Sequence, residues 1–198
     1  MKKIVSFVVC ALLATASFAQ GQFGIIGGLT SSQSKISTAF SDIKAGTANQ
    51  YHVGITYYQP LALGFAIQPG IEYNVKGASF EEINFKTGFV EVPVQVQWGV
   101  NLFSIIRPFV MAEPFIGYAV SNNVSSAGVT LSGWDSVKNR FECGIGLGGG
   151  IQLFKHFQLT VRYFWNLGTL YTANLGSIKT TLAETKCSGV KFSAAILF

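Results

Sequence analysis

Seven charged residues at alternating positions are the first candidates for chemistry in this sequence. Four are acids and three are bases, and each lies on the polar side of a segment in which polar and apolar residues alternate: Glu72, Glu91, Glu113, Arg140, Glu142, Arg162 and Lys191. Such a set can pair as a structural ion network or can line a path for protons or small ions. Because a buried charge without a partner is costly, the near balance of the two signs favours the structural network.

The histidines and cysteines do not form a metal site in the sequence. His52 lies on the polar side of a predicted strand, and His156 lies in a short turn at the opposite end, so the two cannot share a metal. Cys143 is predicted to face lipid and Cys187 to lie in a late loop, which leaves no His/Cys cluster with zinc spacing. We expect free thiols and no metal.

The signals for catalysis are weak. His52 could pair with a serine of a neighbouring strand, as in a hydrolase, but no serine is marked out by its surroundings. Gly144-x-Gly146-x-x-Gly149 has the spacing of a dinucleotide-binding loop, yet a strand follows where that loop requires a helix. These glycines are instead expected to make room for bulky side chains across a narrow barrel. We therefore expect no enzyme and no cofactor.

The first 19 residues have the organisation of an export signal. Two lysines precede an apolar stretch at residues 4–16, and Ser17-Phe18-Ala19 forms a small-x-small cleavage site. Residues 1–19 are thus predicted to be a cleaved signal peptide and residues 20–198 the mature domain. Removing two of the 14 basic residues leaves 12 against nine acids, a scattered net charge of +3 that does not indicate nucleic acid.

The elements that must position the charged residues are strands. Hydrophobic residues make up 49% of the chain, yet no run after residue 19 approaches the roughly 18 apolar residues that a membrane helix needs. Polar and apolar side chains instead alternate along short segments that are separated by clusters of Gly, Asn, Ser, Thr or Pro. The eight predicted strands are residues 22–31, 49–58, 63–76, 89–98, 107–121, 139–154, 157–167 and 190–198.

The connections between these strands alternate between short and long. The short links are residues 59–62, 101–106 and 155–156, and the longer, more polar ones are residues 32–48, 77–85, 122–138 and 168–188. Short turns at one end and long loops at the other are typical of a single-chain outer-membrane barrel with periplasmic termini. The predicted fold is therefore an all-β, eight-stranded antiparallel up-and-down transmembrane β-barrel.

The residue composition of the two strand faces indicates which one meets lipid. A soluble lipocalin-like barrel would have an outer face dense in Lys and Glu, whereas the polar face here holds few charges and many Gly, Gln, Asn and Thr. That composition suits a packed lumen. Four aromatic residues are predicted to form interfacial girdles, namely Tyr73, Trp98, Tyr118 and Trp165. The last strand resembles the C-terminal signal for barrel insertion, through Phe192, Ile196 and Phe198.

Four stretches resemble the PorT-like outer-membrane β-barrel family of the Bacteroidetes. Residues 70–77, Gly-Ile-Glu-Tyr-Asn-Val-Lys-Gly, are similar to its GxExxYSxKG-type strand, with tighter spacing here. Residues 89–94 resemble its YLEIPL strand, residues 107–117 its PYxxxGPxxG strand and residues 161–163 its RY strand. Glu113-Pro114 departs from the more usual Gly-Pro. The family includes a component tied to a secretion system, so the resemblance implies an outer-membrane location more than a defined task.

These observations predict an exported protein of the outer membrane. We expect a monomer that contacts the lipid bilayer, the barrel-insertion machinery and an extracellular or periplasmic protein partner. Its long loops would act in a structural, interaction or secretion-accessory role. Two alternatives remain open, a narrow ion or small-solute channel and an outer-membrane lipid-modifying enzyme with His52 as its candidate.

Overall fold

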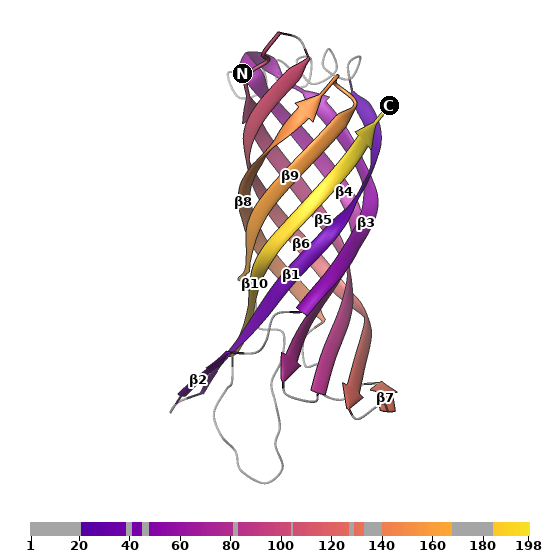
Figure 1. Cartoon of the computed structure of the whole chain (residues 1–198), viewed down its shortest axis with the longest axis vertical. Helices are drawn as coiled ribbons and strands as arrows, with labels where there is room; N and C mark the ends of the chain where they lie inside the picture. Colours follow the sequence, from indigo (N-terminus) through magenta and orange to yellow (C-terminus); the bar gives the residue numbers. More distant parts are fainter. Residues whose placement is uncertain are drawn as a thin grey trace, which may run out of the picture.

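Alternating residues build long antiparallel strands that close into a barrel in the computed structural model (Figure 1). The structure describes residues 21–38, 41–44, 48–80, 83–103, 105–126, 129–132, 140–167 and 184–198. Within these residues, eight strands form the wall: β1 (Gln22–Thr38), β3 (Ala48–Pro60), β4 (Phe65–Phe80), β5 (Ile83–Gly99), β6 (Ile106–Ser126), β8 (Phe141–Leu153), β9 (Phe157–Asn166) and β10 (Glu184–Leu197). Two short strands, β2 (Ser41–Lys44) and β7 (Val129–Ser132), pair with β1 and β6.

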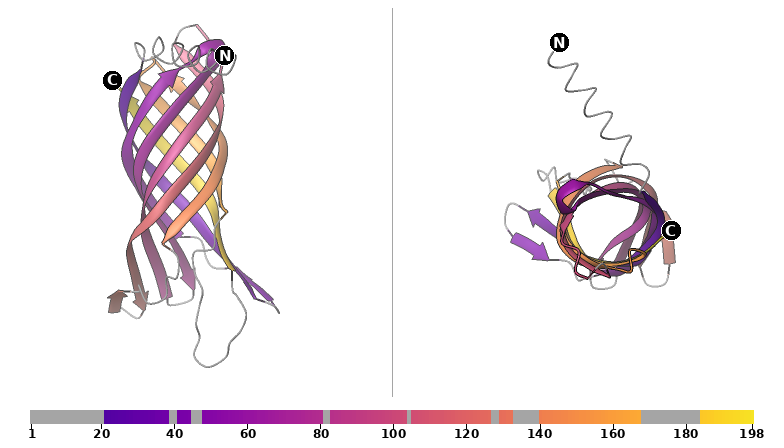
Figure 2. Two further views of the ribbon diagram at one scale, coloured as in Figure 1. Left: turned by 180° about the vertical axis from the view of Figure 1, so that it is seen from behind. Right: turned by 90° about the horizontal axis from the view of Figure 1, so that it is seen from above.

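The barrel closes by pairing its first strand with its last. The wall strands are antiparallel neighbours in the order β10, β9, β8, β6, β5, β4, β3, β1, and β1 pairs with β10 from Gly24–Leu197 to Ser37–Glu184. Figure 2 shows the resulting ring from above. Closure satisfies the backbone polar groups of the wall, as a strand structure in lipid requires. The predicted eight-stranded up-and-down barrel is confirmed.

The two ends of the barrel differ. At the end that we call the turn end, wall strands are joined by short connections, and Phe198 lies there too (Figure 1). The 3-10 turn η2 (Ala62–Gly64) is one of these connections. In another, Phe154 and Lys155 have φ angles of 51° and 64°, as at the two central positions of a type I′ turn, and the backbone N–H of His156 donates to the carbonyl oxygen of Leu153. At the other end, which we call the loop end, β2 and β7 extend beyond the wall.

All four of the long loops predicted from the sequence are partly strand. β4 and β5 pair from Gly77–Lys86 to Phe80–Ile83, so the prediction of a loop at residues 77–85 is wrong. β1 continues to Thr38 and β6 to Ser126, and β10 begins at Glu184 instead of Val190. The prediction ended strands where side-chain alternation faded, but a hairpin needs alternation only where one of its faces is apolar. Residues 168–183 of the fourth predicted loop and residues 1–20 lie outside the described residues.

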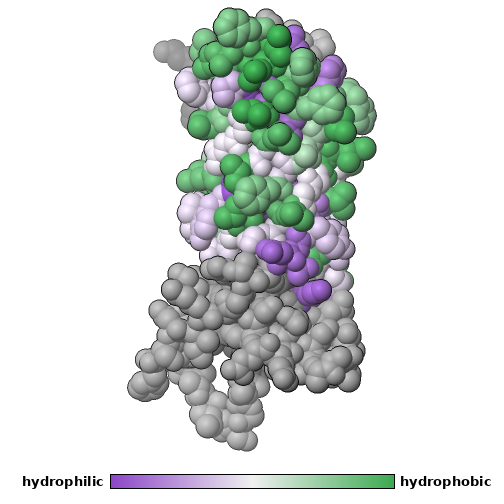
Figure 3. All heavy atoms as spheres, in the orientation of Figure 1, coloured by the Kyte–Doolittle hydropathy of each residue, from purple (hydrophilic) through white to green (hydrophobic). Residues whose placement is uncertain are grey.

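The wall separates an apolar outer face from a polar interior. Along β9, exposed and buried residues alternate without exception, with Leu159, Val161 and Tyr163 outside and Thr160 and Arg162 inside. Large apolar side chains cover much of the outer surface seen in Figure 3. A soluble lipocalin-like barrel would have the opposite arrangement. In the described part of the chain, no helix has the length and apolar character needed to cross a membrane.

Candidate functional site in the barrel interior

A glycine-rich strand allows side chains of its two neighbouring strands to meet inside the barrel. β8 lies between β6 and β9, and four of its inward positions are glycines: Gly144, Gly146, Gly148 and Gly150. Across this gap, Phe115 of β6 approaches Phe164 of β9, with ring centroids 6.4 Å apart. The space expected from the glycines therefore exists, and side chains of the two adjacent strands use it.

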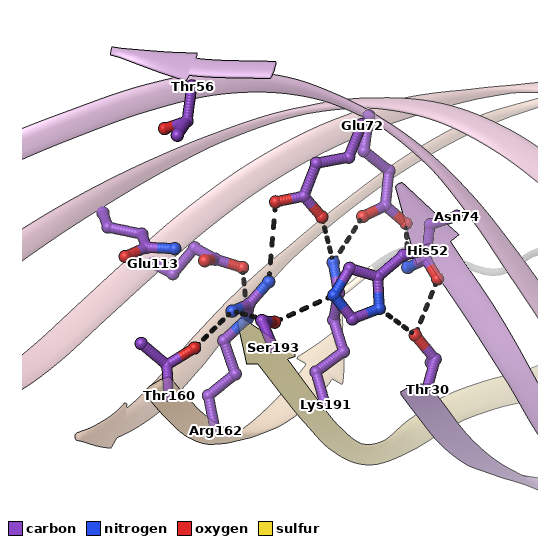
Figure 4. A network of polar contacts seen from close by, with 12 residues as sticks. Thr30, His52, Thr56, Glu72, Asn74, Glu113, Thr160, Arg162, Lys191 and Ser193 are labelled. Atoms are coloured by element: carbon purple, nitrogen blue, oxygen red, sulfur yellow. Dashed lines mark hydrogen bonds and ion pairs between the residues drawn. The ribbon is translucent and has the colours of Figure 1, made fainter. Parts of the chain in front are cut away.

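Arg162 is the centre of a first charged cluster (Figure 4). Its Nε lies 2.9 Å from Oε1 of Glu113 on β6, and its Nη2 lies 3.6 Å from Oε1 of Glu72 on β4. The Nζ of Lys191 on β10 donates to Oε2 of Glu72 at 2.7 Å. All four side chains are buried, so they neutralise one another in a place that water cannot readily screen.

Lys76 of β4 forms a second cluster, nearer the loop end. Its Nζ lies 2.8 Å from Oε1 of Glu91 and 2.7 Å from Oε1 of Glu142. Three phenyl rings surround the same ammonium group, with centroids 4.6 to 5.2 Å from Nζ: Phe89, Phe115 and Phe164. Carboxylates and ring faces both attract a cation, so this pocket suits the Lys76 ammonium group.

Lys191 joins the two clusters into one network, and Gly117 leaves room for two acids of the second cluster. The Nζ of Lys191 also lies 3.4 Å from Oε2 of Glu91. Gly117 of β6 is the register neighbour of both Glu91 on β5 and Glu142 on β8, and a Cβ there would lie within about 3.0 Å of both side chains. Acids and bases consequently alternate along one chain of ion pairs: Glu113, Arg162, Glu72, Lys191, Glu91, Lys76 and Glu142.

His52 joins this network through hydroxyl groups (Figure 4). Its Nε2 lies 2.8 Å from Oγ of Ser193, and its Nδ1 lies 3.1 Å from Oγ1 of Thr30. Ser193 accepts a hydrogen bond from Nη1 of Arg162 at 3.1 Å, and Thr30 donates to Oδ1 of Asn74 at 2.9 Å. The histidine is thus held in place at both ring nitrogens.

Gly28 lies between His52 and Ser193 in the sheet, which is why the sequence did not reveal that the two are partners. It lies on β1, opposite His52 on β3 and opposite Ser193 on β10. A Cβ at Gly28 would lie 2.9 Å from Cε1 of His52 and 2.8 Å from Cα of Ser193. The serine is therefore not on a strand paired with that of His52, and only the register of the closed sheet identifies it.

The interior contains six of the seven charged residues predicted for the lumen: Glu72, Glu91, Glu113, Glu142, Arg162 and Lys191. The prediction for Arg140 is wrong, because this residue is exposed and precedes Phe141, the first residue of β8. Alternation therefore does not carry its side chain inward. Lys76 is the third base of the ion-pair network instead. The sequence could have revealed it, because Lys76 lies an even number of residues from Glu72 on the same strand, so that alternation places both side chains on one face.

The interior opens into a polar cavity of about 620 Å³ at the turn end. Arg107 lines this cavity, and its Nη2 donates to the carbonyl oxygen of Gly64 at 2.9 Å. Its Nη1 donates to Oε1 of Gln97 at 3.0 Å, and Gln97 donates in turn to Gln68 and Gln95. A layer of buried glutamines thus lies inward of Arg107.

The interior can hold charge in a fixed arrangement. His52 and Ser193 have the spacing of a base and a nucleophile, but they are only 2% and 6% exposed and are packed within the network. Among the described residues, no group of His, Cys, Asp and Glu side chains could hold a metal ion. Cys143 of β8 is a free thiol. His52 and Ser193 are thus part of a packed ionic core.

The predicted interfacial and terminal residues lie on the wall. Trp98, Tyr118 and Trp165 are exposed, and Tyr73 is half-buried with its hydroxyl 3.0 Å from Oγ of Ser121. Trp98 precedes Gly99, the last residue of β5, near the turn end. The apolar residues at the end of the chain are also exposed: Phe192, Ile196 and Phe198.

A closed barrel with an apolar outer face and an ion-paired interior defines a transmembrane β-barrel of the outer-membrane type. The chain belongs to the family of outer membrane protein beta-barrel domains, whose model matches residues 18–172. It is an outer-membrane protein, and the predicted location is confirmed.

Solved structures with a similar fold have distant sequences. Neisserial surface protein A superimposes with a TM-score of 0.52 at 12% identity, over 89% of this chain and 97% of that chain. Ail, the attachment invasion locus protein of Yersinia pestis, gives 0.46 at 16% identity, over 90% and 99%. OprG from Pseudomonas aeruginosa gives 0.47 at 13%, over 90% and 96%. The likeness to the neisserial protein supports the fold alone. A comparison with curated proteins gives no match.

Proposed function

We propose that this protein is a closed outer-membrane anchor that acts through its loop-end segments and their partners. The alternating chain of ion pairs from Glu113 to Glu142 carries the proposal, because it crosses the interior and joins six of the wall strands. A passage for solutes would require these buried pairs to separate, which leaves uncompensated charges. A rigid wall with a filled lumen instead supports the segments that extend beyond it.

The same proposal gives roles to residues on the wall and at the termini. The turn end would face the periplasm and the loop end the cell exterior, as in other single-chain barrels. Residues 1–19 would be removed as a signal peptide. Aromatic side chains would hold the barrel at the two interfaces, and the last strand would address it to the insertion machinery. The residues concerned are Tyr73, Trp98, Tyr118, Trp165, Phe192, Ile196 and Phe198.

The resemblance to the PorT-like family supports a secretion-accessory role for the loop end. Replacing residues 127–139 and 168–183 by short Gly/Ser linkers keeps every described wall strand. We expect this variant to retain heat-modifiable migration as a folded monomer and to lose capture of cell-surface partners and any secretion phenotype. A variant that keeps every partner and every phenotype would contradict the proposal.

A narrow ion channel is a second candidate, because ionisable side chains follow one another through the interior. Planar-bilayer recordings of the wild type separate the two functions, since a closed anchor should give no current above background. The double variant Glu113→Ala and Arg162→Ala serves as the open control, because it removes two large side chains beside the glycines of β8. Steady wild-type current would favour the channel.

The pair of His52 and Ser193 keeps a lipid-modifying enzyme as a third candidate, because Nε2 and Oγ are 2.8 Å apart. Purified wild type, His52→Ala and Ser193→Ala can be incubated with phospholipid and lipopolysaccharide. The anchor proposal expects no product above background for any of the three. Product formation by the wild type that both substitutions abolish would replace it.

A further inference from the structure

Three turn residues combine a large apolar side chain with a backbone conformation that disfavours it. Leu63, Phe103 and Phe154 have φ angles of 60°, 51° and 51°. They are 89%, 93% and 61% exposed, and each belongs to a different turn-end connection. This left-handed region suits Gly, which has no Cβ, and Asn, whose short polar side chain can hydrogen-bond locally. Backbone geometry alone therefore does not explain the choice of Leu and Phe, and a separate requirement for apolar surface is indicated.

The apolar surface of these turns is continuous with that of the wall. Exposed Val100, Leu102, Ile105 and Ile106 connect Phe103 with the outer face of β6, where Val110 is also exposed. In Figure 3, hydrophobic residues gather at the turn end, at the top of the view. The lipid-facing surface thus extends past the ends of the strands and over the turns.

The charged residues beside these turns are basic. Residues 61–65, 99–107 and 153–157 include Arg107 and Lys155 but no Asp or Glu. Both basic residues line the cavity at the turn end together with His156. Arg107 is only 6% exposed and donates to Gly64 and Gln97 inside the barrel, whereas Lys155 is exposed. Apolar side chains beside this exposed lysine match an anionic phospholipid leaflet, in which acyl chains contact the apolar side chains and phosphates contact the cation.

We propose that the turn end is immersed in its bilayer leaflet as an apolar collar, formed by Leu63, Phe103 and Phe154, with Lys155 at the level of the lipid phosphates. The immersion accounts for large apolar side chains at positions where the backbone favours Asn or Gly. Continuity with the lipid-facing wall favours lipid as the occupant. A protein partner docked on the same rim is the competing occupant, and it would leave the rim in water when lipid alone is present.

Spin labels can locate the collar directly. Single cysteines at positions 63, 103 and 154, in a mature protein carrying Cys143→Ala and Cys187→Ala, are labelled and reconstituted in vesicles of phosphatidylcholine and phosphatidylglycerol. Collisions with oxygen should exceed those with a water-soluble nickel chelate at all three positions, as at the wall control Val110. The exposed Lys86 of β5 should show the reverse. Aqueous accessibility at positions 63 and 103 would overturn the proposal.

Asparagine substitutions should change the stability in opposite directions, depending on whether the turns lie in water or in lipid. Asn fits the left-handed conformation, so Leu63→Asn, Phe103→Asn and Phe154→Asn should raise stability if the turns lie in water. In a lipid collar they should instead lower the urea midpoint in vesicles and slow insertion severalfold, as Val110→Asn should on the wall. A raised midpoint in the single variants would overturn the proposal.

The phosphate contact has its own control. Lys155→Gln should slow insertion into vesicles that contain phosphatidylglycerol and should leave the rate unchanged in phosphatidylcholine alone. An equal effect of this substitution in both vesicles would remove the anionic lipid from the proposal.

Discussion

Glu113 and Arg162 lie on strands that are not paired with one another, yet Oε1 of the first is 2.9 Å from Nε of the second. β8 stands between the two strands, with Gly146 opposite Glu113 and Gly148 opposite Arg162. The missing side chains of β8 therefore determine this ion pair as much as the two charges do. The glycines of the strand should consequently differ in how well they tolerate a methyl group.

Gly148→Ala should destabilise the barrel, whereas Gly146→Ala should be nearly neutral. A Cβ at position 148 would overlap the carbonyl oxygen of Val161 and lie 2.6 Å from Cα of Arg162, so β8 and β9 would have to separate. At position 146 the nearest atom, Cβ of Glu113, is 3.6 Å away, which is an ordinary contact. Overpacking of this kind costs about 1–3 kcal/mol. Urea unfolding in lipid vesicles, followed by tryptophan fluorescence, measures both variants, and equal midpoints would contradict the expectation.

The ion pair itself can be measured with a double-mutant cycle. Arg162→Met leaves Glu113 buried without its cation and should cost about 3–5 kcal/mol. Glu113→Gln removes the charge on the other side and should cost less. Because the two residues are in contact, the double variant should be more stable than the sum of the single effects implies, by about 0.5–3 kcal/mol. Unfolding free energies that simply add would show that the pair contributes no coupling.

A glycine on β1 should be as critical for His52 as those of β8 are for Arg162. In Gly28→Ala, the new methyl group would overlap the carbonyl oxygen of Phe192 and lie 2.9 Å from Cε1 of His52. We expect a lower unfolding midpoint and a changed ¹⁵N shift of the His52 ring, because the hydrogen bond to Ser193 is lost. The adjacent Gly27→Ala is the matched control, since its nearest atom is 3.5 Å away. An unchanged His52 spectrum in Gly28→Ala would refute this account.

Side-chain alternation predicted the wall well where one face meets lipid. The predicted strand at residues 157–167 is nearly the observed β9, Phe157–Asn166, because every second residue there must be apolar. Beyond the apolar band the constraint disappears, and hairpin pairs such as Gly77–Lys86 carry no such signal. Side-chain alternation also gave the wrong position for Arg140, because this residue precedes its strand.

The partners within the site required information that a single sequence lacks. Alternation predicted that Glu72 and Arg162 point inward, but it could not reveal that they meet, because their strands are far apart in the chain. The contacts depend on register and on closure through β1 and β10. The aromatic pocket around Lys76 was likewise missed, since its three phenylalanines come from β5, β6 and β9.

That aromatic pocket gives the last test. Lys76→Met keeps a long side chain among the rings but leaves the carboxylates of Glu91 and Glu142 without the cation that lies within 2.8 Å of both. We expect a loss of about 3–5 kcal/mol at neutral pH, because two acids then share a buried site without the base. Adding Glu142→Gln should restore part of the loss, since Glu91 still has Lys191 at 3.4 Å. Lys86→Met removes an exposed lysine and controls for net charge. If the double variant were no more stable than Lys76→Met in vesicle unfolding, repulsion between the two carboxylates would not explain the defect.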